Sequence, residues 1–173
     1  MQNSLDELPF SNLDDKEFEN LQDNDYYVQC RTPDSFTSSI LTNSNMLPDF
    51  FENYNLNDFL LLHLNTRSLS KNFNELHELI CSMQIQPDIV GITETKLNVN
   101  SNLDLVHISG YKFYSCNSLS FSGGVAIHAK NSLQIKIRND INLYSIDFES
   151  IWIETSSVND KNSTLIGVVA FYL

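Results

Sequence analysis

A chain of 173 residues with 42% hydrophobic and 11% aromatic content suits one ordinary domain, or one small domain with a tail. The net charge is −12, but residues 59–173 carry only −2, which offers no strong basic patch, so tight nonspecific binding of nucleic acid is not predicted. No apolar run approaches the roughly 20 residues that span a bilayer. The first ten residues, MQNSLDELPF, are acidic and lack the basic head and apolar run of a signal peptide, so we expect an intracellular protein.

The acidic charge is concentrated in the first third of the chain. Residues 1–58 hold 12 acidic residues against 2 basic ones, whereas residues 59–173 hold 10 against 8. Little continuous apolar surface occurs before residue 59, so we predict an acidic, largely disordered extension over residues 1–58 and a domain over residues 59–173. A short motif at Asp25-Tyr26-Tyr27 that docks on a protein partner is the functional alternative for this extension.

The cysteines are few and widely spaced. Cys30, Cys81 and Cys116 make no CxxC pair, which argues against a disulfide framework and against a cysteine zinc site. Reduced thiols in an intracellular protein are the simpler interpretation.

The most informative stretch runs from residue 59 to residue 97. Leu60–Leu64 is a short apolar run typical of a buried strand, and apolar residues then recur at helical spacing over Phe73–Met83. Either Ser70 or Asn72 is suited to cap this helix. The β-branched segment Ile89–Thr93 follows as a second strand, which predicts a crossover unit with two parallel strands.

Two polar residues follow these strands directly. Asn65 comes after the first strand and Glu94 after the second. Because residues just beyond the carboxyl ends of parallel strands face the ligand crevice of such sheets, we expect Asn65 and Glu94 to lie together.

Beyond residue 110 the pattern changes to short strands without intervening helices. Several segments alternate between apolar and polar residues with period two, and turn residues separate them. We predict strands at Tyr111–Cys116, Gly124–Ala129, Leu133–Ile137, Glu149–Glu154 and Thr164–Phe171. The expected fold is therefore α/β, with a mixed, mostly antiparallel sheet and one early crossover helix.

Six segments, in this order, carry a resemblance to a known family: HLNTRSLSKNFNELHELI, PDIVGITETKL, SGYKFY, GGVAIHAK, ESIWIE and LIGVV. Together they resemble the endonuclease domain of non-long-terminal-repeat retrotransposons. That domain belongs to the endonuclease/exonuclease/phosphatase superfamily, with apurinic/apyrimidinic endonucleases and deoxyribonuclease I-like enzymes. The resemblance covers about residues 59–169 and implies a two-sheet α/β sandwich that hydrolyses DNA phosphodiesters with Mg²⁺ at one edge.

The resemblance also implies roles for individual residues. Glu94, within Thr-Glu-Thr, matches the family's metal-binding glutamate, and Asn65 matches the asparagine that helps to hold the metal and the phosphate. These residue types suit Mg²⁺, which prefers carboxylate oxygen and acts as a Lewis acid on phosphate. Arg67 is a candidate phosphate contact, although an exposed arginine more often does nothing specific.

Two later motifs of the family, D-x-N and S-D-H, do not occur in the sequence where they are expected. The resemblance therefore implies the first half of the domain, an incomplete sandwich whose first sheet lacks a partner on its inner face. We expect no nuclease activity from this chain alone. The rival hypothesis is a non-catalytic interaction fragment in which residues 1–58 recruit a protein partner.

Overall fold

The computed structural model describes residues 59–117, 123–143, 145, 148–156 and 163–171, together with the backbone of two strands nearer the N-terminus. The strands are β1 (Tyr26–Thr32), β2 (Ser35–Leu41), β3 (Phe59–Asn65), β4 (Ile89–Thr93), β5 (Tyr111–Cys116), β6 (Val125–Lys130), β7 (Gln134–Ile137), β8 (Phe148–Ser156) and β9 (Thr164–Phe171). The helices described are α3 (Leu69–Ser82) and the short 3-10 helix η2 (Leu103–Val106).

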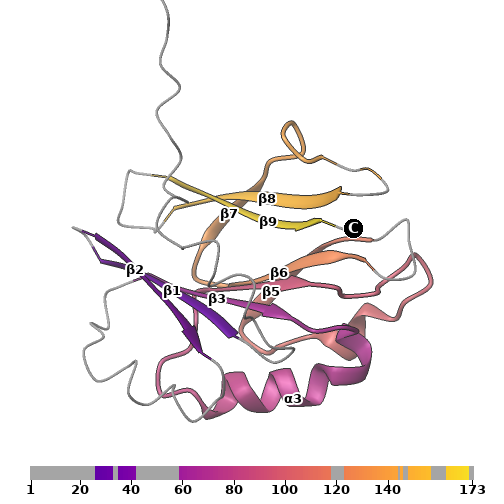
Figure 1. Ribbon diagram of the computed structural model, residues 1–173, viewed down its shortest axis with the longest axis horizontal. Coiled ribbons are helices and arrows are strands. Elements are labelled where there is room, and N and C mark those ends of the chain that lie inside the picture. The colour runs from indigo at the N-terminus through magenta and orange to yellow at the C-terminus, as the bar shows by residue number, and fades with distance from the viewer. Residues whose placement is uncertain are drawn as a thin grey trace, which may run out of the picture.

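The fold is mixed α/β with two mostly antiparallel sheets. Sheet A has six strands in the order β2-β1-β3-β4-β6-β5, and sheet B has three in the order β7-β8-β9. Helix α3 covers one face of sheet A and sheet B covers the other, so the described chain forms three layers (Figure 1).

The predicted crossover is confirmed. Strands β3 and β4 are parallel neighbours joined by α3, with Asn65 opposite Thr93 at their carboxyl ends. The predicted start of the helix is wrong, because α3 begins at Leu69 after Ser68. Leu69 is fully buried and its N–H donates to the Thr95 carbonyl at 2.9 Å, which fixes the first turn by a tertiary contact. Asn72 therefore lies inside the helix, where its side chain donates to the Thr66 carbonyl at 2.7 Å.

The period-two pattern of β6 separates two hydrophobic cores. Val125, Ile127 and Ala129 pack in the core between the two sheets, whereas Ala126 packs in the core under α3. All four side chains are fully buried. A strand buried on both faces in this way accounts for the nearly continuous apolar run GGVAIHA in the sequence.

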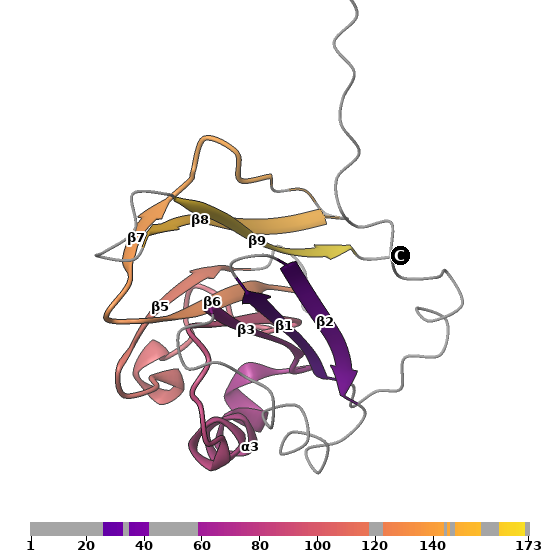
Figure 2. The same cartoon turned by 90° about the vertical axis from the view of Figure 1, so that its left-hand side faces the viewer.

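The expectation that the inner face of sheet A lacks a partner is wrong. Strands β7, β8 and β9 form a sheet of their own that lies across this face (Figure 2). Ile151, Ile153 and Val168 are buried against sheet A. Alternation along β8 and β9 supplies an apolar face that packs against β4, β5 and β6, so the described strands of sheet B cover this part of sheet A.

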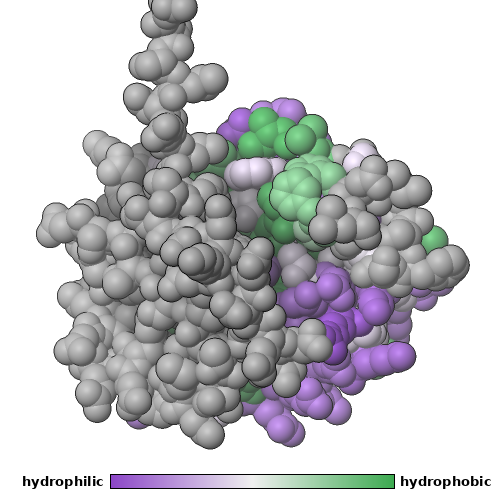
Figure 3. All heavy atoms as spheres, viewed as in Figure 1, coloured by the Kyte–Doolittle hydropathy of each residue, from purple (hydrophilic) through white to green (hydrophobic). Residues whose placement is uncertain are grey.

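The outer face of sheet B keeps apolar residues at the surface. Phe171 is 74% exposed and Leu165 is 48% exposed on β9. In Figure 3 hydrophobic residues gather on the sheet B side of the visible surface.

The N-terminal strands differ from the largely disordered extension that composition predicts for residues 1–58. β1 pairs antiparallel with both β2 and β3, and Tyr26 lies opposite Leu64. Strand pairing uses backbone groups, and β3 would otherwise present a row of unpaired N–H and C=O groups, so an acidic sequence can still add to this edge. The side chains of Tyr26 and Tyr27, like residues 1–25 and 42–58, lie outside the described part of the chain.

Two predictions from bulk composition, on the cysteines and on membrane-spanning segments, can be compared with the structure. Cys81 and Cys116 are both free thiols. No helix within the described ranges is long and apolar enough to cross a membrane.

Candidate functional site

Asn65 and Glu94 lie together at one edge of sheet A. The Asn65 side chain donates a hydrogen bond from Nδ2 to Glu94 Oε1 at 2.7 Å. The parallel pairing of β3 with β4 produces this contact, because it places residue 65 opposite residue 93 and delivers residue 94 one step beyond.

The hydrogen bonds of Asn65 define what each end of its amide does. The backbone N–H of Arg67 donates to Asn65 Oδ1 at 3.1 Å, so the amide oxygen accepts locally and the amide nitrogen faces Glu94. The lone pair of an amide nitrogen is delocalised into the carbonyl, so the Asn65 Nδ2 group donates hydrogen bonds and does not ligate a cation. Glu94, which is half-buried, is therefore the residue of the pair that offers oxygen to a metal, and Asn65 orients it.

The backbone around this pair is unusual. In the described residues, positive φ at non-glycine positions occurs three times, at Arg67 (52°), Glu94 (52°) and Lys96 (53°). Such conformations cost of the order of 1–3 kcal/mol each and cluster at sites where the surrounding structure enforces them. One of them is Glu94 itself, and the other two lie two residues after Asn65 and Glu94; nothing in the sequence signals them.

Backbone hydrogen bonds hold the segment on both sides of Glu94. The Thr93 carbonyl accepts from the Thr66 N–H at 3.1 Å. On the other side, Thr95 N–H donates to the Gly124 carbonyl at 3.1 Å and Lys96 N–H donates to the Gly123 carbonyl at 2.7 Å. Backbone hydrogen bonds thus hold Thr93 and Thr95 on either side of Glu94, which limits the directions that the Glu94 side chain can take.

A second carboxylate supports this segment from sheet B. Glu149 on β8 is 1% exposed, and its Oε2 accepts from the Gly124 N–H at 2.5 Å. Sequence reasoning treated ESIWIE only as a strand and missed this residue. The signal was present, because Glu149 shares its alternation with the inward-facing residues Ile151 and Ile153.

Two histidines with lowered pKa values lie on the strands of sheet A, His63 partly buried on β3 and His128 fully buried on β6. Burial lowers the pKa of His63 to about 4 and that of His128 to about 3, so both are neutral near pH 7. His63, predicted to be a hydrogen-bonded core residue, is partly buried and lies beside Gly91 in the β3–β4 pair. Trp152, also predicted to serve packing, lies against Gly167.

The donor set near Glu94 fits a weakly held, mostly hydrated Mg²⁺. This ion commonly binds through one or two carboxylates and keeps several waters. Within the part of the chain that the structure describes, no three His, Cys, Asp or Glu residues gather as a metal-holding group. Glu94 can therefore supply one hard oxygen ligand, with Asn65 fixing its orientation.

Comparison with models of known protein families finds no match for this chain. A search of curated proteins likewise finds no matching protein.

Proposed function

We propose that Asn65 and Glu94 form the first part of a Mg²⁺-dependent phosphodiesterase site on an incomplete sandwich of the deoxyribonuclease I type. DNA is the proposed substrate class, through the resemblance to retrotransposon endonucleases. The observation that carries the proposal is the 2.7 Å hydrogen bond between these two side chains at the ends of two parallel strands.

Each residue has a separate task in this proposal. Glu94 ligates the ion, and Asn65 holds Glu94 Oε1 so that the carboxylate does not rotate away. Mg²⁺, when bound, polarises a phosphate oxygen and stabilises the leaving oxygen. Arg67 and Lys96 are exposed and lie within two residues of the pair in the chain, which makes them the candidate phosphate contacts of this proposal.

Metal binding and hydrolysis are separate expectations. Attack on a phosphodiester needs a group that orients and deprotonates water, in addition to the metal ligand. His128 is fully buried and cannot reach a substrate, and desolvation lowers the pKa of His63 to about 4, well below the range that suits a general base near pH 7. We therefore expect this chain to bind Mg²⁺ weakly and not to cleave DNA.

The test is Mn²⁺ binding, followed by the relaxation of water protons, for the wild type and for Glu94→Gln. Glu75→Gln is the matched control, because Glu75 is an exposed residue of α3 away from the strand ends. We expect Glu94→Gln to lose binding that Glu75→Gln retains. Equal binding by the wild type and Glu94→Gln would reject the metal site.

A plasmid-nicking assay with Mg²⁺ tests the absence of cleavage. Intact supercoiled plasmid is the expected result. Nicking by the wild type that disappears in Glu94→Gln would overturn the proposed inactivity while supporting the metal role of Glu94.

A further inference from the structure

Glu149 is a fully buried carboxylate whose hydrogen bond links the two sheets. It lies on β8 in sheet B, but its Oε2 accepts from Gly124, the residue that precedes β6 in sheet A. Burying a carboxylate costs several kcal/mol unless hydrogen bonds compensate, so a carboxylate here needs strong donors. Its effect reaches the neighbouring thiol, because burial raises the pKa of Cys116 and the Glu149 carboxylate raises it further.

The donor to Glu149 also contacts the metal-ligand segment. Gly124 uses its N–H for Glu149 and its carbonyl for Thr95, the residue after Glu94. Gly123 adds the parallel bond to Lys96. Glu149 and Glu94 are therefore joined through one peptide turn and two backbone hydrogen bonds.

The Gly123–Gly124 turn packs closely against the segment that carries Glu94 and Thr95. Gly124 has a φ of 98°, and a β-carbon on it would lie 2.2 Å from Thr95 Oγ1. Thr95 is 1% exposed, and its Oγ1 also accepts from the Leu97 N–H at 3.3 Å. A displacement of the turn must therefore move Thr95, and with it the strained backbone of Glu94.

We propose that Glu149 is a positioning residue for Glu94: its carboxylate anchors the Gly123–Gly124 turn, and the turn sets the affinity of Glu94 for a divalent cation. The inference rests on the proposed function, since it deepens the same site. Charge-assisted hydrogen bonds are roughly twice as strong as neutral ones, so a neutral isostere weakens the anchor without removing the acceptor.

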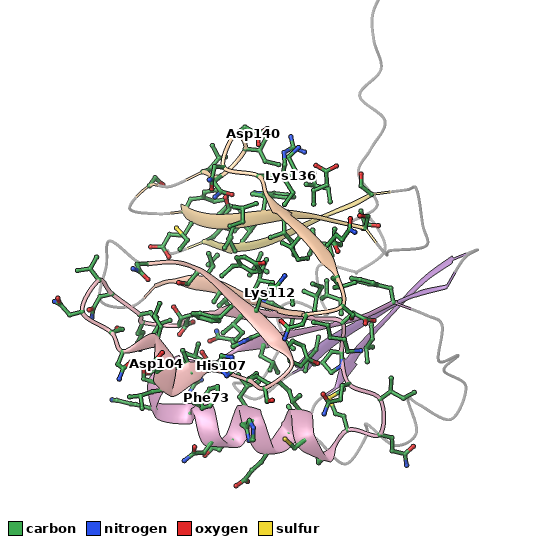
Figure 4. The ribbon with its side chains drawn as sticks, turned by 180° about the vertical axis from the view of Figure 1, so that it is seen from behind. Phe73, Asp104, His107, Lys112, Lys136 and Asp140 are labelled. Atoms are coloured by element: carbon green, nitrogen blue, oxygen red, sulfur yellow. The ribbon has the colours of Figure 1, made fainter. Side chains whose placement is uncertain are left out.

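The first experiment compares Mn²⁺ binding by the wild type, Glu149→Gln and Glu154→Gln. Glu154 is the matched control, because it is also a β8 glutamate but forms ion pairs with Lys136 and Arg138 instead of contacting the turn. Figure 4 shows Lys136 and Asp140 on this outer side of sheet B, away from α3. We expect Glu149→Gln to weaken Mn²⁺ binding several-fold and Glu154→Gln to leave it unchanged.

The second experiment is independent of metal and measures amide hydrogen exchange without divalent cations. The N–H groups of Thr95 and Lys96 bond to the turn, whereas the N–H of Leu69 bonds to Thr95 from the helix. We expect Glu149→Gln to speed exchange at Thr95 and Lys96 more than at amides within β4. If Glu149 only stabilised the fold as a whole, exchange would rise equally at Thr95, at Lys96 and at the amides within β4, in proportion to the lost global stability.

The combined outcomes separate the two proposals. If the wild type binds no Mn²⁺ through Glu94 but exchange at Thr95 and Lys96 responds selectively, the proposed function fails and the anchoring by Glu149 stands. If Mn²⁺ binds through Glu94 and Glu149→Gln matches the wild type in affinity, Glu149 does not position Glu94. Exchange that rises uniformly would reject the positioning role as well.

Discussion

The indole of Trp152 lies against the backbone of Gly167 on the outer face of sheet B, directly across the β8–β9 pair. A β-carbon on Gly167 would come within 2.5 Å of two indole carbons. Glycine inside a strand usually marks a close approach of this kind, so Gly167 is explained by its aromatic neighbour.

Replacing Gly167 with Ala should displace the indole and destabilise the fold by about 1–2 kcal/mol, the usual range for mild overpacking. Trp152 is the sole tryptophan of the sequence, so its fluorescence reports the displacement directly. We expect emission at longer wavelength and a lower midpoint of thermal unfolding.

Leu165→Ala is the control for the Gly167 variant, because Leu165 lies on the same face of β9 and its truncation adds no atom near Trp152. The control should leave the emission maximum in place. An unchanged emission maximum in Gly167→Ala would show that the indole does not rest on Gly167.

Local periodicity made the central unit predictable. The β3-α3-β4 crossover and the five strands from β5 to β9 follow from apolar spacing and turn residues, which act over a few neighbours. The meeting of Asn65 with Glu94 then follows from geometry, since parallel strands end at one edge.

The features that the sequence did not predict depend on contacts between residues far apart in the chain. The start of α3 depends on Leu69 bonding to Thr95, and the β1–β2 hairpin depends on the free edge of β3. The closure of the inter-sheet core by β7–β9 and the role of Glu149 both depend on how two sheets stack. The contacts of Leu69 and of the β3 edge leave no mark on the spacing of nearby residues, whereas the alternation of β8 indicates which side chains face inward but not what they contact.

His128 predicts a pH dependence of stability. It is fully buried beside Phe113, with ring centroids 4.6 Å apart, and its ring nitrogens have no hydrogen-bond partner among the described residues. Burial lowers the pKa of His128 to about 3, whereas the unfolded group titrates near 6.5. The unfolded state therefore binds the extra proton between those values, and stability is lost as pH falls from about 6.5.

His128→Leu should remove this contribution. Well below pH 6.5 one such histidine gives a slope of about 1.4 kcal/mol per pH unit, so denaturant unfolding at pH 7.5 and pH 5 resolves it. His63, whose pKa is lowered to about 4, is unchanged in the variant and retains its own slope. At pH 7.5 the variant should be as stable as the wild type or more so, because an unsatisfied N–H is gone.

The exposed His107, labelled in Figure 4, provides the control for this experiment. Burial is the main cause of the lowered pKa of His128 and His107 only adds to it, so His107→Gln should keep most of the acid sensitivity of the wild type. If His128→Leu is as acid-sensitive as His107→Gln, the titration of His128 does not control stability.

Asp88 joins three strands at the end of sheet A where β4 begins. Its carboxylate accepts from the Leu60 N–H at 2.9 Å and pairs with Lys130 Nζ at 2.9 Å. Asp88→Asn keeps an acceptor for the Leu60 N–H but loses the ion pair with Lys130, so we expect the free energy of unfolding to fall by roughly 1–2 kcal/mol. This is less than for a fully buried ion pair, because both groups are partly exposed to solvent.

Salt distinguishes the ion pair from the hydrogen bond at Asp88. The difference between wild type and Asp88→Asn in chemical unfolding should shrink at high ionic strength, because salt screens the pair with Lys130 and not the bond to Leu60. A difference independent of salt would assign the whole effect to the hydrogen bond.

Asn65→Asp should turn the candidate site from an orienting pair into a pair of carboxylates. Without metal, the variant loses the N–H donated to Glu94 and places two negative groups together, so we expect a loss of about 1–2 kcal/mol. With saturating Mg²⁺ the two carboxylates share the ion, and binding to the folded state alone restores stability. Thermal unfolding with and without Mg²⁺ measures both effects, with Asn74→Asp on the exposed face of α3 as the matched control. Stabilisation by Mg²⁺ that is no larger in Asn65→Asp than in Asn74→Asp would contradict a cation site at Glu94.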